Sequence, residues 1–61
     1  MKLVEARSIV REVSGKSYDW LKAWGLSTIS EAVRTIENRQ SSTDADRERA
    51  YDVKVKLWRK Y

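Results

Sequence analysis

The sequence predicts a small all-α protein, a bundle of three to four short helices that forms one domain over residues 1–61. Three observations favour helices. Apolar residues recur every three or four positions in successive segments, and the residues that border these segments commonly begin or end helices. In addition, the chain has no proline, which would interrupt a helix. Sixty-one residues leave room for only one domain.

Two helices are expected in the first part of the chain. The first covers residues 2–13, and Ser14-Gly15 ends it, because glycine readily adopts the left-handed conformation that follows many helices. Its apolar face consists of Leu3, Ala6, Ile9, Val10 and Val13. The second helix is short, covers residues 18–24, and has Ser17 as its N-cap and Gly25 as its stop.

A third helix is expected to begin at Thr28 and to end near Arg39-Gln40. Thr28 is followed three residues later by Glu31, and this spacing is typical of a capping box, in which both side chains bond to backbone N–H groups. The apolar stripe of this helix consists of Ile29, Ala32, Val33 and Ile36. A polar connector, residues 41–44, comes next and offers Thr43 or Asp44 as a cap for the segment that follows.

The last segment, residues 45–61, permits two structures. Residues 51–57 alternate between apolar and charged side chains, which is the pattern of a half-buried strand. Residues 44–50 instead favour a helix, and a lone strand would have no partner for its backbone groups. We therefore predict one continuous helix, with a strand over 51–58 as the alternative.

The three tryptophans can either help build the core or form an interface with another protein. Trp20 and Trp24 are four residues apart and share a helical face, whereas Trp58 is distant in sequence. We expect the tryptophans to help build the core, because a chain this short has few large apolar residues. The expected core is Leu3, Ile9, Val10, Val13, Trp20, Leu21, Trp24, Ile29, Val33, Ile36 and part of the last segment. The alternative is a protein interface of Trp20, Trp24, Trp58 and Tyr61, since tryptophan and tyrosine are enriched where proteins meet.

Composition excludes several classes of function. The chain has no cysteine and no histidine, which removes disulfides, zinc sites built on these residues and catalysis that depends on them. The acidic residues Asp44, Asp46 and Glu48 lack the glycine and distal glutamate of a calcium loop. We therefore expect no enzymatic activity, no metal, no cofactor and no small-molecule substrate. The chain also lacks an apolar run of about 20 residues, so we expect an intracellular, cytoplasmic protein that does not enter membranes.

Positive charge is concentrated near the end of the sequence. The chain has 13 Lys+Arg and 9 Asp+Glu, a net charge of +4. Residues 51–61 contain four basic residues and one acidic residue, so they contribute +3 of that total. Aromatic residues are interleaved with these charges, a combination suited to binding single-stranded nucleic acid. The alternative is a solvated helix end whose cations favour the negative pole of the helix dipole.

A second face suited to binding nucleic acid is expected on the third helix. There Ser30, Arg34 and Asn38 point away from the apolar stripe, and arginine and asparagine can recognise guanine and adenine. A short helix, Gly25 and a further helix in succession resemble a helix-turn-helix in outline. However, Glu31 stands where that motif buries an aliphatic residue, so a generic helical hairpin is the alternative.

Two functions follow from these patterns. The first is a small basic DNA- or RNA-binding accessory protein of regulatory type. Its expected contacts are Arg34, Asn38, Lys54, Lys56, Arg59 and Lys60. The second is a protein-binding module, an inhibitor, adaptor or subunit of an assembly that uses the aromatic residues and has no role with nucleic acid. A protein partner or a homodimer would also compensate for the small core.

Overall fold

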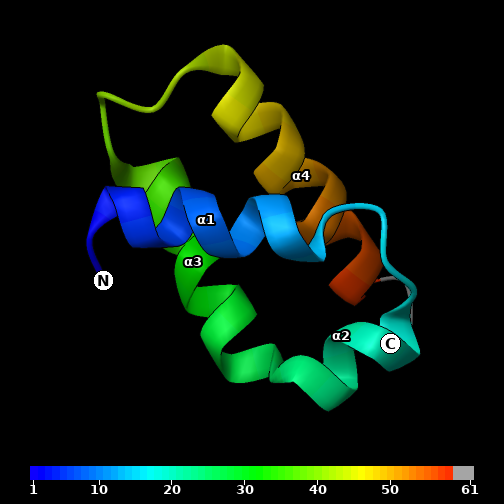
Figure 1. Cartoon of the computed structure of the whole chain (residues 1–61). Helices are drawn as coiled ribbons and strands as arrows, with labels where there is room; N and C mark the ends of the chain where they lie inside the picture. Colours follow the sequence, from blue (N-terminus) through cyan, green and yellow to red (C-terminus); the bar gives the residue numbers. More distant parts are fainter. Residues whose placement is uncertain (59–61) are drawn as a thin grey trace.

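The computed structural model describes residues 1–58 and confirms the all-α prediction. It has four helices, α1 (Leu3–Val13), α2 (Tyr18–Trp24), α3 (Leu26–Asn38) and α4 (Asp44–Trp58) (Figure 1). Residues 51–58 belong to α4, so the helix is adopted there and the alternative strand is not. None of these helices is long and apolar enough to cross a membrane.

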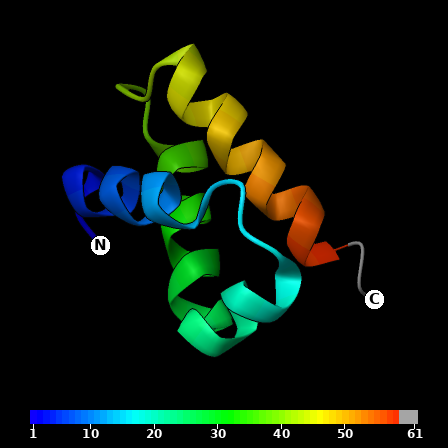
Figure 2. The same cartoon turned by 45° about the vertical axis from the view of Figure 1, so that its right-hand side comes forward.

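Helix α3 is the centre of the bundle and packs against each of the other three helices. α1 lies across α3 and α4, and α2 extends from the beginning of α3, as the two views in Figures 1 and 2 show. Small and aliphatic side chains fill the space between the helices. The buried apolar residues are Ala6, Val10, Val13, Leu21, Ile29, Ala32, Val33, Ile36, Ala50, Val53 and Leu57.

The prediction that the tryptophans help build the core is wrong for two of the three. Trp20 is 37% exposed and Trp58 is 67% exposed, whereas Trp24 is half-buried against the core. Each exposed tryptophan is adjacent in sequence to a buried leucine, Leu21 or Leu57. Successive residues on a helix point about 100° apart, so the buried leucine directs its neighbour away from the core.

A single residue, Gly25, joins α2 to α3. Its φ of +131° is disfavoured for residues with a side chain, and it both ends α2 and begins α3. The Gly25 carbonyl already accepts a bond from the amide of Ile29 at 3.2 Å. Thr28 therefore lies inside the helix, and the predicted capping box with Glu31 is wrong. A helix-turn-helix has a turn of about three or four residues, so the outline resemblance does not extend to this junction.

A reciprocal capping pair occurs instead at the start of α4. Thr43 Oγ1 accepts a bond from the amide of Asp46 at 3.1 Å, and Asp46 Oδ2 accepts one from the amide of Thr43 at 3.0 Å. The same carboxylate oxygen accepts a bond from Arg7 Nε at 2.8 Å, which ties α1 to α4. The Thr43 amide, and after it the Arg7 guanidinium, lower the pKa of the Asp46 carboxyl below its ordinary value.

Candidate nucleic-acid interface

A shallow groove of about 160 Å³ runs between α3 and α4 and brings together three of the predicted site residues. Arg34 comes from α3, and Lys54 and Trp58 come from α4. The other residues that line the groove are Ser30, Val33, Glu37 and Leu57. The two helices meet here because Val33 and Leu57 face the core, which leaves polar residues at the rim.

Lys54 is the central charge of this groove. Its Nζ lies 3.1 Å from Glu37 Oε2 and 4.9 Å from the centroid of the Trp58 ring. The ion pair and the cation–π contact therefore fix the ammonium beside an indole that is 67% exposed. Arg34 adds a second positive charge at the opposite rim, so the groove retains a net charge of +1 with Glu37 included. The groove therefore presents the Trp58 ring together with the cations of Arg34 and Lys54.

The remaining predicted residues lie elsewhere. Asn38 is the last residue of α3 and is exposed, but it does not line the groove. Lys56 points toward the α1–α2 connection, where its Nζ donates to the Lys16 carbonyl oxygen. Lys54 and Lys56 therefore occupy opposite flanks of α4, as expected for residues two apart on a helix. The predicted contacts Arg59, Lys60 and Tyr61 lie outside the described residues.

The two tryptophans of α2 do not share one environment. Trp20 is at the surface, with the Lys16 ammonium 5.3 Å from its ring centroid. Trp24 packs against the core and is only partly accessible. Of the four residues predicted as a protein interface, Trp20 and Trp58 thus present accessible rings, and both rings are paired with a lysine.

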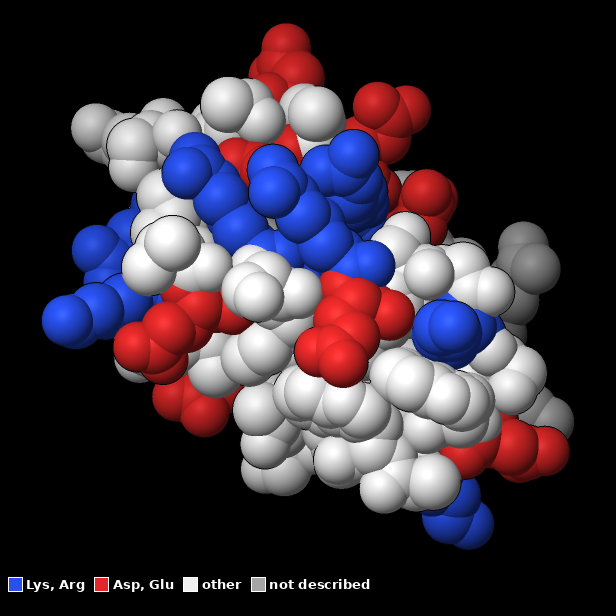
Figure 3. All heavy atoms as spheres, viewed as in Figure 1, with Lys and Arg blue, Asp and Glu red and all other residues white. Residues whose placement is uncertain are grey.

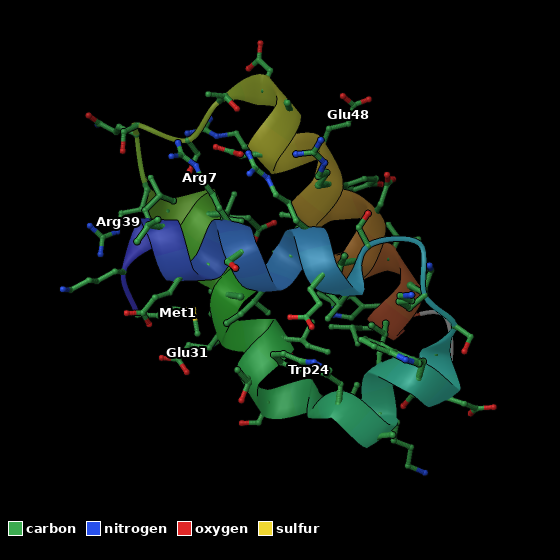
Figure 4. All side chains as sticks on the ribbon, viewed as in Figure 1. Met1, Arg7, Trp24, Glu31, Arg39 and Glu48 are labelled. Atoms are coloured by element: carbon green, nitrogen blue, oxygen red, sulfur yellow. The ribbon has the colours of Figure 1, made fainter. Side chains whose placement is uncertain are left out.

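A cluster of arginines that the sequence does not reveal surrounds the α3–α4 connection. Arg7 Nη2 donates to the Ser41 carbonyl at 3.4 Å, Arg47 Nη2 donates to the Arg39 carbonyl at 2.9 Å, and Arg39 Nη2 donates to the Met1 carbonyl at 3.5 Å. Figure 3 shows basic side chains gathered over α1 and the first turns of α4, and Figure 4 labels Arg7 and Arg39. We call Arg7, Arg39 and Arg47 the arginine cluster.

The arginine cluster keeps most of its charge. Among residues 1–58, its carboxylate partner is Asp46, and the other acceptors of these guanidiniums are backbone carbonyls, which orient a cation without neutralising it. Three positive charges and one negative charge leave +2. No sequence pattern indicates this cluster, because its members come from α1, from the connection and from α4 and meet only in the folded chain.

Comparison of the chain with models of protein families, with curated proteins and with solved structures gives no match.

Proposed function

We propose that this protein is a small non-enzymatic accessory protein that binds nucleic acid through the groove between α3 and α4. The observation that carries the proposal is the exposed Trp58 ring, which lies beside Lys54 in a groove that also contains Arg34. Cations attract phosphates, and an aromatic face can stack on a base, so one surface offers both kinds of contact.

The charge distribution supports the same proposal. The chain has a net charge of +4, and a basic protein is attracted to a polyanion at long range. Arg34 and Lys54 are placed to contact phosphates, while Lys56 lies on the other flank of α4 and is not part of this groove. Binding that depends on phosphate contacts weakens as salt rises, because counterions are released when the complex forms.

Glu37 provides a direct test of this groove. Glu37→Gln removes the carboxylate that holds Lys54, so we expect the affinity for nucleic acid to rise about threefold to tenfold at low salt. Glu48→Gln is the matched control, because it makes the same change of charge at an exposed position of α4 that does not line the groove. The measurement is a titration of labelled DNA and RNA, single-stranded and duplex, at several salt concentrations.

The outcomes separate clearly. A larger gain for Glu37→Gln than for Glu48→Gln supports the groove as the binding surface. Equal gains would show that only the overall charge matters and would contradict the proposed site. No binding by the unchanged protein at micromolar concentration and low salt would contradict the function itself.

A second candidate function, a protein-binding module, is favoured by the exposure of Trp20 and Trp58. Rings of this size at the surface are typical of residues that dominate protein interfaces. Sedimentation across a range of protein concentrations, with and without DNA, distinguishes the two candidates. A homodimer that forms without DNA and is lost in Trp20→Ala or Trp58→Ala, while each variant stays folded, would favour the protein interface.

A further inference from the structure

One face of α4 carries cations and aromatic rings in alternation. Arg47, Tyr51, Lys54 and Trp58 are spaced at i, i+4, i+7 and i+11, which places all four positions along one narrow stripe of the helix. Both rings are accessible, with Tyr51 62% exposed and Trp58 67% exposed. We call these four residues the α4 stripe.

The α4 stripe connects the two basic surfaces described above. At one end, Arg47 belongs to the arginine cluster and bonds to the Arg39 carbonyl. At the other end, Lys54 and Trp58 line the groove with Arg34. The arginine cluster and the groove therefore lie at the two ends of the α4 stripe, and Tyr51 between them also lines a separate pocket with Ser14, Gly15 and Lys56. We call the stripe together with these two ends the track. Arg47 and Trp58 are eleven positions apart on the helix, which gives a length of about 16 Å.

We propose that this track binds a single strand of nucleic acid, with phosphates near Arg47 and Lys54 and unpaired bases against Tyr51 and Trp58. This inference rests on the proposed function and names its substrate. A duplex would not suit the stripe, because paired bases already stack on their neighbours and hide their faces from an exposed ring. An unpaired strand offers those faces and its phosphates together.

The dimensions fit a short segment of strand. Tyr51 and Trp58 are seven residues apart, or about 10 Å along the helix axis, so each ring receives a different base. At the stacked spacing of about 3.4 Å per nucleotide, the track accommodates at most about five nucleotides, and fewer in an extended strand. One face of the Trp58 ring is in contact with Lys54, which leaves the other face for a base.

The test compares labelled single-stranded 20-mers of DNA and of RNA with a 20-base-pair DNA duplex, by fluorescence anisotropy. We expect at least one single strand to bind about tenfold more tightly than the duplex. Trp58→Ala should then weaken single-strand binding about tenfold or more, and Tyr51→Ala should weaken it by a smaller factor. Trp20→Ala is the matched control, since Trp20 is also exposed and paired with a lysine but lies on α2, outside the track.

The arginine end of the track is tested by its salt dependence. Arg47→Ala should weaken binding and reduce the slope of log affinity against log salt by about 0.7 for the loss of one phosphate contact. Arg49→Ala is the control, because Arg49 is exposed on α4 two positions away and so points to a different side of the helix. Circular dichroism of each variant checks that the fold is retained.

Two results would overturn the inference without contradicting nucleic-acid binding itself. The first is duplex binding as tight as single-strand binding. The second is that the Trp58→Ala and Tyr51→Ala variants bind a single strand like the unchanged protein, which would also remove Trp58 from the proposed binding groove. The absence of binding to every probe would instead overturn the proposed function together with the inference.

Discussion

Replacing Ile36 with alanine is expected to unfold most of the protein at 25 °C. Ile36 is fully buried on α3, the helix that contacts the other three, so the cavity would form at the centre of the bundle. Such a truncation costs about 2–5 kcal/mol. A core in a chain of this length supplies only about 3–5 kcal/mol, so the loss is comparable to the whole stability.

Urea denaturation followed by circular dichroism measures this effect. Val4→Ala is the control, because Val4 is an aliphatic residue on α1 that is 68% exposed, and its truncation should change the free energy of unfolding by less than about 0.5 kcal/mol. An Ile36→Ala protein as stable as Val4→Ala would show that α3 does not occupy the centre of the core.

Replacing Asp46 with asparagine is expected to lower stability substantially, because one side chain serves two connections. Its carboxylate caps α4 through the Thr43 amide and pairs with Arg7 of α1. Asparagine is nearly the same size but lacks the charge, so Arg7 loses its anionic partner at a buried position, since Asp46 is only 5% exposed. The expected result is a lower urea midpoint at neutral pH.

The same carboxylate predicts how stability depends on pH. The Thr43 amide, followed by Arg7, holds the folded pKa of Asp46 below its ordinary value. A carboxyl with a lowered pKa in the folded state stabilises the fold fully above its ordinary pKa, about 3.9, and loses that contribution as the pH falls through the folded value. The unchanged protein should therefore lose stability below about pH 4, and Asp46→Asn should lose less over the same range.

Asp44→Asn is the control for both measurements, since Asp44 is in the same first turn of α4 but is exposed. Urea midpoints measured at several pH values compare the three proteins. If Asp44→Asn and Asp46→Asn behave alike, the connection between α1 and α4 through Arg7 contributes nothing to stability, and the prediction is wrong.

The helices could be predicted from the sequence because their signals are local. The apolar stripe of α3 is present in the chain as Ile29, Val33 and Ile36, and the structure buries all three. The Ser17 cap of α2 is also confirmed, with Ser17 Oγ accepting a bond from the Trp20 amide at 3.3 Å. Spacing and capping preferences need no knowledge of the rest of the fold.

The errors arose where local signals compete. Thr28 and Glu31 have the spacing of a capping box, but Gly25 begins the helix earlier and leaves Thr28 inside it. Thr43 and Asp46 form the actual pair, with aspartate in the position that the motif usually gives to glutamate or glutamine. Whether α3 begins at Gly25 or at Thr28 depends on where the chain turns. The position of that turn is decided by how the helices pack.

The candidate site was predictable only in part. Positive charge alone predicts Arg34 and Lys54 as contacts, and the structure brings them into one groove, but nothing in the sequence indicates that they are neighbours. The contact of Glu37 with Lys54 spans 17 positions in the chain, and that of Arg7 with Asp46 spans 39. Contacts between such distant residues depend on how the helices pack, which short-range patterns do not encode.

The placement of Trp20 and Trp24 on α2 affects what intrinsic fluorescence reports. Trp20 and Trp24 belong to α2, a helix of seven residues whose buried anchor is Leu21. A helix this short has little stability of its own, so it can detach at a lower free energy than the bundle needs to unfold. Emission from these two indoles would then follow the detachment of α2, whereas dichroism follows the whole bundle. The difference between the unfolding midpoints seen by fluorescence and by dichroism would measure how tightly α2 is coupled to the other helices.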